Sequence, residues 1–105
     1  MKGKILITGA NWGIGFEISK QMALKNYYVI LGVRRISEGQ KAIKKLLDNG
    51  ISKSLLDLIQ IDLNNNDSIK KANNYIKNNH SNLDTLINNA GIAGDISKPA
   101  LNHCF

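Results

Sequence analysis

The sequence contains little cysteine, little proline and no long apolar run. Its single cysteine, Cys104, can form no intramolecular disulfide and no cysteine-based metal site, which favours a reducing cytoplasm. The single proline, Pro99, lies near the end, and no linker divides the chain. No segment approaches the roughly 20 apolar residues of a membrane span, and the run at 5–7 is too short for a signal peptide. We therefore expect no membrane partner.

The composition is that of one soluble globular unit. Of the 105 residues, 43% are hydrophobic and 21% are charged. A domain of this size buries about two thirds of the surface of its unfolded chain, which provides a modest core. Two domains are therefore excluded.

The net charge of +6 raises the question of a nucleic-acid partner. The lysines, however, are scattered over segments with the spacing of amphipathic helices, and no aromatic residues are interleaved with them. We therefore expect solvated helix faces and no nucleic acid. The lysines concerned are Lys41, Lys44, Lys45, Lys70, Lys71 and Lys77.

Short aliphatic runs alternate with segments of helical spacing. The runs predict four strands, at 4–8, at 28–33, within 56–63 with its end at Asp62, and at 83–88. The helical spacing predicts three helices, from Ile14 to near Asn26, between Ser37 and Gly50, and from Asp67 or Ser68 through Ile76. This β-α-β-α-β-α-β order predicts a doubly wound α/β parallel sheet. We assign it to residues 1–94 and expect an irregular tail at 95–105.

Local signals predict where these helices begin and end. Ser37 with Gln40 three residues later resembles a capping box, and Gly50 is expected to end the same helix. Asp67 or Ser68 is expected to cap the third helix. His80 is expected on the surface.

The informative residues follow the first strand. Ligands of doubly wound sheets bind beyond the carboxyl ends of the strands. There the chain reads Thr8-Gly9-Ala10-Asn11-Trp12-Gly13-Ile14-Gly15. Gly9 permits a tight turn, Gly13 lets the backbone approach a pyrophosphate, and Gly15 permits close packing of helix on sheet. The N–H groups that begin the helix would then face the phosphates.

The glycine spacing differs from the common G-x-G-x-x-G pattern. Thr8-Gly9-x3-Gly13-Ile14-Gly15, together with Asn88-Asn89-Ala90-Gly91 after the fourth strand, resembles the short-chain dehydrogenase/reductase family, whose fold is Rossmann-like. Within that family, Gly9–Lys20, Tyr28–Arg34 and Leu83–Gly91 look most like the cytosolic carbonyl-reductase-like members. The resemblance extends to about Gly94.

The resemblance implies where a nicotinamide dinucleotide binds. Asp62 matches the family's acceptor for the adenine amino group, with the backbone of Leu63 beside it, and Asn89, Ala90 and Gly91 match the segment that touches the ribose. The alternatives are that Asp62 only caps a strand end and that Asn88-Asn89 is only a turn. The resemblance assigns the pyrophosphate and nicotinamide side to Gly9, Gly13, Ile14 and Gly15, and Asn11 and Trp12 of the same turn are also expected to bind the cofactor.

The end of the second strand predicts the cofactor. NAD enzymes usually place a carboxylate there, whereas NADP enzymes place an arginine for the 2′-phosphate. This chain has Arg34-Arg35 and no acid until Glu38, so we expect NADP(H), with NAD(H) as the open alternative. Many NADP-using relatives carry a basic residue where this chain has Trp12, whose indole could stack on Arg34, shield the phosphate or pack over the loop.

The catalytic part of the family pattern is not found. The family uses Tyr-x-x-x-Lys, and no tyrosine here is followed by lysine at that distance. The resemblance therefore implies the amino-terminal half of an NADPH-dependent oxidoreductase that acts on carbonyl compounds. A non-catalytic NADPH-binding module and a non-functional fragment are the alternatives. As partners we expect the missing half or a second copy, because the fourth strand would be an unpaired edge.

Overall fold

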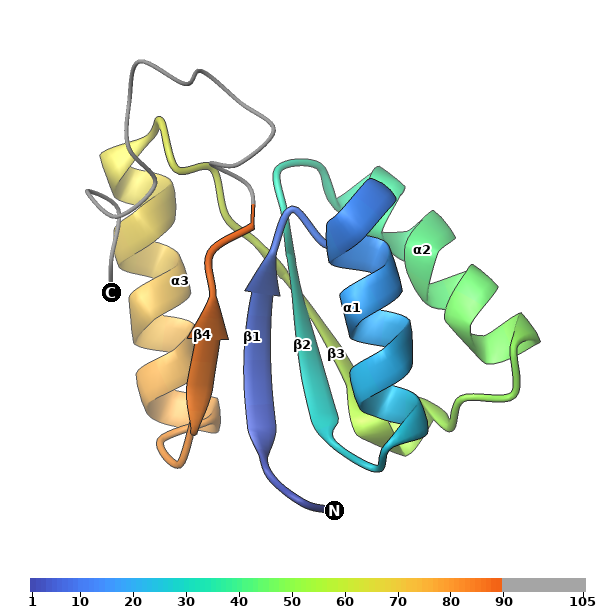
Figure 1. Cartoon of the computed structure of the whole chain (residues 1–105). Helices are drawn as coiled ribbons and strands as arrows, with labels where there is room; N and C mark the ends of the chain where they lie inside the picture. The colour runs from blue at the N-terminus through green and yellow to red at the C-terminus, as the bar shows by residue number, and fades with distance from the viewer. Residues whose placement is uncertain (90–105) are drawn as a thin grey trace.

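The computed structural model describes residues 1–89, so Ala90, Gly91 and the expected tail at 95–105 lie outside the described residues. Four strands form one parallel sheet in the order β3-β2-β1-β4 (Figure 1). The strands are β1 (Lys4–Thr8), β2 (Tyr28–Val33), β3 (Leu56–Gln60) and β4 (Thr85–Ile87). The helices are α1 (Gly13–Leu24), α2 (Ile36–Asp48) and α3 (Asn66–Asn79), with a short 3-10 helix, η1 (Lys53–Leu55). The predicted doubly wound α/β fold is confirmed.

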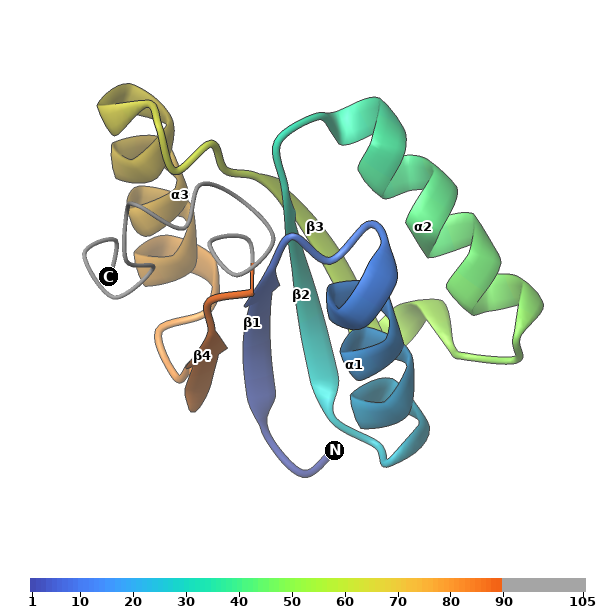
Figure 2. The ribbon, with the colours of Figure 1, turned by 45° about the horizontal axis from the view of Figure 1, so that its top comes forward.

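Helices cover both faces of the sheet. This agrees with the sequence of β1 and β2, which place apolar side chains on both faces. Figure 2 shows α1 and α2 on one side of the sheet and α3 on the other. Ile7 and Leu31 pack on the first side with Leu46 of α2, whereas Leu6 and Ile30 pack on the second side with Ala72 of α3. Continuous aliphatic runs therefore predicted these central strands correctly.

The ends of α2 confirm one predicted cap and correct another. Ser37 does not cap the helix: α2 begins at Ile36, and Arg35 in the N-cap position makes no side-chain capping bond. Gly50 follows the last residues of α2 with a φ of 86°, and Ile51 N–H donates to the carbonyl of Leu46 at 3.2 Å. This left-handed glycine and its bond form a Schellman ending.

The start of α3 is also corrected. The capping residue is Asn65, whose Oδ1 accepts from the N–H of Ser68 at 3.1 Å. Asp67 is exposed, and Ser68 is buried inside the first turn. β3 ends at Gln60 rather than at Asp62. One further hydrogen bond to the end of β2 follows, from the N–H of Ile61 to the carbonyl of Val33 at 2.7 Å.

The strand order places the site. From β1 the sheet extends one way to β2 and β3 and the other way to β4, so the order reverses beside β1. Because all four strands are parallel, their carboxyl ends meet at one edge, at the top of Figure 1.

No helix among residues 1–89 is long and apolar enough to cross a membrane. The helix lysines named above are exposed, as predicted.

Candidate dinucleotide-binding edge

The turn between β1 and α1 requires glycine at two positions. Gly9 has a φ of 63° and Gly13 a φ of 57°, a region that side chains with a Cβ rarely adopt. A Cβ at Gly13 would meet no atom within 4 Å, so the backbone there is open to a ligand. The predicted close approach at Gly13 therefore has both the conformation and the space it needs.

Gly15 permits the close packing that the sequence predicted. A Cβ at this position would collide with the carbonyl oxygen of Gly9 and with the side-chain amide of Asn89. Asn89 is buried, and its Nδ2 donates to the carbonyl of Gly9 at 3.3 Å. The end of β4 is thereby fastened to the glycine turn.

A second bond between β1 and β4 comes from a residue that sequence reasoning gave no role. Thr8 is buried, and its Oγ1 donates to Oδ1 of Asn88 at 3.0 Å. The signal was present, because Thr8 directly precedes the glycine motif. The two strands that flank the reversal of strand order are therefore joined at their carboxyl ends by side chains.

The amino terminus of α1 lies at this edge and carries no side-chain cap. Trp12, in the N-cap position, makes no capping bond, and no acidic residue stands in the first turn. The side chains of Trp12 (61% exposed) and Ile14 (66% exposed) leave the helix start accessible. Free N–H groups and the positive end of the helix dipole favour an anion here. No cation lies over the Trp12 indole within residues 1–89, so of the alternatives for Trp12 the stacking on Arg34 is not found there.

Two predicted site residues from different strand ends lie side by side. Arg34 follows β2 and Asp62 follows β3, and Arg34 Nε is 3.9 Å from Asp62 Oδ1. The same Oδ1 accepts from the N–H of Asn64 at 3.0 Å, which orients the carboxylate. The Arg34 side chain is 69% exposed, so most of the guanidinium is available to a further anion. Arg35 is exposed beside it, and the Leu63 side chain packs on the α3 side of the core.

The opposite edge of the sheet holds a separate cluster. His80 is buried, which corrects the expected surface position: its Nε2 lies 2.8 Å from Asp57 Oδ2 and its Nδ1 lies 3.2 Å from Lys4 Nζ. Tyr75 also donates to Asp57 Oδ2, at 2.7 Å. Burial alone would raise the pKa of Asp57, but the bonds from Tyr75 and His80 hold it below its ordinary value. The bond to Asp57 raises the pKa of Tyr75 to about 12.

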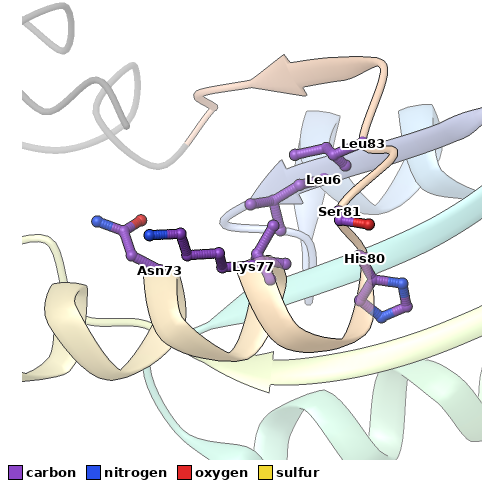
Figure 3. A pocket seen from close by; sticks show the side chains of 7 residues that line it. Leu6, Asn73, Lys77, His80, Ser81 and Leu83 are labelled. Atoms are coloured by element: carbon purple, nitrogen blue, oxygen red, sulfur yellow. The ribbon is translucent and has the colours of Figure 1, made fainter.

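His80 also lines a pocket of about 300 Å³ between α3 and β1 (Figure 3). Its apolar lining residues are Leu6, Ile76 and Leu83, and Lys77 also lines it. None of the residues predicted to bind a cofactor lines this pocket. The candidate site is therefore the open carboxyl edge.

The family described as short chain dehydrogenase matches residues 3–104. The chain belongs to the short-chain dehydrogenase family. Its similarity to (-)-isopiperitenone reductase of Mentha piperita is 42% identity over 90 residues, covering 85% of this chain and 29% of that protein. Its similarity to carbonyl reductase [NADPH] 1 of Mus musculus is 39% identity over 89 residues, covering 84% of this chain and 31% of that protein. The chain thus spans about a third of the length of these short-chain dehydrogenases.

Solved short-chain dehydrogenase structures share the fold. The menthone neomenthol reductase of Mentha piperita superimposes with a TM-score of 0.79 at 36% identity, covering 87% of this chain and 32% of that one. The salutaridine reductase of Papaver somniferum gives a TM-score of 0.78 at 33% identity, covering 89% and 31%. The predicted resemblance, including that to carbonyl reductases, is confirmed. The match is to the amino-terminal part of such short-chain dehydrogenases.

Proposed function

We propose that the chain binds NADP(H) and supplies the adenosine and pyrophosphate portion of the cofactor site of a carbonyl-reducing short-chain dehydrogenase. The observation that carries the proposal is the pairing of Arg34 with Asp62 on the edge that also holds the start of α1. No carboxylate follows β2 until Glu38, and Glu38 is paired with Lys41 at 3.6 Å. A 2′-phosphate at the end of β2 therefore meets the largely exposed guanidinium of Arg34, and the carboxylate beside that guanidinium, Asp62, comes from the neighbouring strand end.

The three parts of this edge suit three parts of the dinucleotide. The uncapped N–H groups from Gly13 onward, beside the open space at Gly13, suit the pyrophosphate. The exposed guanidinium of Arg34 suits a 2′-phosphate, which it can bind with two parallel hydrogen bonds. The half-buried carboxylate of Asp62 suits the adenine amino group as an acceptor.

The cofactor would supply a hydride for a carbonyl carbon. The described residues would hold its adenosine end and would bind NADH more weakly than NADPH, because NADH lacks the 2′-phosphate that would pair with Arg34. A mouse relative that is named as an NADPH enzyme, 39% identical over 89 residues, supports this preference. Tyr-x-x-x-Lys does not occur in the 105 residues, so we propose cofactor binding, rather than turnover, for this chain alone.

A fluorescence titration tests the proposal. Trp12, the only tryptophan, lies in the glycine turn, so its emission should quench saturably with NADPH and more weakly with NADH. Arg34→Ala should remove most of the difference between the nucleotides. Lys41→Ala, which removes an equal charge from an exposed residue of α2, should keep it. Equal affinity for both nucleotides, or no binding, would contradict the proposal.

A further inference from the structure

We propose that Gln60 and Ser68 are positioning residues that set the place of Arg34 and Asp62 in the cofactor site. They do so through a relay of hydrogen bonds between the ends of β2 and β3 and the first turn of α3. This inference rests on the proposed function. It assigns selectivity for the 2′-phosphate to residues that make no expected contact with the cofactor.

Ser68 is the centre of the relay. It is buried, with 6% of its surface exposed, although serine at the start of a helix is ordinarily exposed. Its Oγ accepts from the backbone N–H of Asp62 at 2.8 Å and donates to Oε1 of Gln60 at 3.0 Å. The loop that carries Asp62 is therefore fastened to α3.

Gln60 extends the relay to the neighbouring strand end. Its Nε2 donates to the backbone carbonyl of Arg34 at 3.2 Å. The donors thus run in one direction, from the N–H of Asp62 through Ser68 and Gln60 to the carbonyl of Arg34. Hydrogen bonds in such a chain polarise one another and strengthen together.

The backbone of Ser68 is held by the capping bond at the start of α3. Asn65 caps α3 by accepting from the N–H of Ser68 at 3.1 Å, so both the backbone and the side chain of Ser68 are held. The Ser68 hydroxyl cannot rotate away without leaving the N–H of Asp62 without this partner. Local capping and the contact between strands therefore depend on the same residue.

Arg34 needs such support, because its own side chain provides little. The guanidinium is largely exposed, and its pairing with Asp62 is long at 3.9 Å. Exposed pairs of this kind contribute little to order. Binding a phosphate through two parallel bonds, however, requires the guanidinium at a defined place. Among the described contacts of Arg34, the bond from Gln60 to its carbonyl is the one that holds the backbone from another element.

The other end of α3 provides a matched control. There Tyr75 donates to Asp57 at the start of β3 at 2.7 Å, on the edge opposite to the cofactor site. Tyr75→Phe therefore loosens the same helix from the same strand without touching the relay. A general loss of stability should affect both ends, whereas loss of positioning should follow only the relay.

The experiment measures NADPH and NADH affinities of the full chain by Trp12 emission for three variants. Gln60→Met removes the bond to Arg34 but leaves Ser68 with Asp62, so NADPH affinity should fall about three- to tenfold and NADH affinity should stay within about twofold. Ser68→Ala removes both links, so both affinities should fall, NADPH more than NADH. Tyr75→Phe should leave the ratio of the two affinities unchanged.

Two further measurements keep the test decisive. Ser68→Thr retains the hydroxyl and should restore the ratio lost in Ser68→Ala. In the free chain, amide hydrogen exchange at Asp62 should accelerate in Ser68→Ala and not in Tyr75→Phe. If the wild type prefers NADPH but Gln60→Met keeps its ratio, the relay is overturned and the proposed function stands. If the wild type binds neither nucleotide, both are overturned.

Discussion

The side-chain amide of Asn89, at the end of β4, donates to the carbonyl oxygen of Gly9 in the turn after β1, at 3.3 Å. The bond joins residues 80 positions apart and occupies the space that a Cβ at Gly15 would need. The glycine turn is therefore shaped by β4 as well as by its own glycines.

Loss of the Asn89 side chain should loosen the turn. Asn89→Ala leaves the Gly9 carbonyl without this donor and should lower the free energy of unfolding by about 1 kcal/mol. Asn79→Ala removes an exposed side-chain bond of the same type, to the carbonyl of Tyr75, and should cost less. Urea unfolding of both variants provides the comparison. Equal costs would contradict a special role for Asn89.

The two glycines should tolerate alanine unequally. Gly13→Ala meets only the penalty of a left-handed φ, about 1–2 kcal/mol, because the space around it is open. Gly15→Ala drives a methyl group into the Gly9 carbonyl and the Asn89 amide and should cost more, despite the better helix propensity of alanine. Thermal unfolding ranks the variants, and the reverse order would argue against the described packing.

Stability should depend on pH through the cluster around Asp57. Because bonds from Tyr75 and His80 hold the pKa of Asp57 below its unfolded value, its contribution is present above the unfolded pKa and is lost as the pH falls through the folded pKa. In urea unfolding, the free energy of unfolding of Asp57→Asn should fall less steeply than that of the wild type between about pH 5 and pH 2. A fall as steep as that of the wild type would contradict a contribution of Asp57 to stability in this pH range.

At alkaline pH, the contribution of Tyr75 to stability should be lost as the pH rises. The pKa of Tyr75 is raised to about 12, so its contribution is complete below the ordinary tyrosine pKa and is lost as the pH rises toward 12. Tyr75→Phe should be less stable than the wild type at pH 8, and the gap should narrow toward pH 12. A constant gap over that interval would show that the Asp57 bond does not govern the titration.

Sequence patterns predicted the elements better than the contacts between them. β1 and β2 have the predicted bounds, because a run that is apolar on both faces is typical of a central parallel strand. The caps were less predictable, because Ser37, Asn65 and Ser68 carry the same capping chemistry and only packing selects among them. Nothing local indicated that His80 would be buried, since its partner Asp57 belongs to a distant strand.

In the candidate site, too, the sequence predicted some contacts and not others. The glycine turn and Asn89 follow from the sequence motif, and the structure brings them together. The nearness of Arg34 and Asp62 could be expected from the adjacency of β2 and β3. The bonds of Gln60 and Ser68 could not, because they depend on the side-chain geometry of three elements.

Fragments of the cofactor test directly whether Arg34 recognises the 2′-phosphate. The chain should bind 2′,5′-ADP more tightly than 5′-AMP, by about tenfold or more, because a charge-assisted bond to Arg34 is worth roughly 1.5–3 kcal/mol. In NMR titrations the Arg34 side-chain Nε–H signal should shift with the first ligand and not with the second. Equal affinities with an unmoved Arg34 signal would contradict recognition of the 2′-phosphate at this edge.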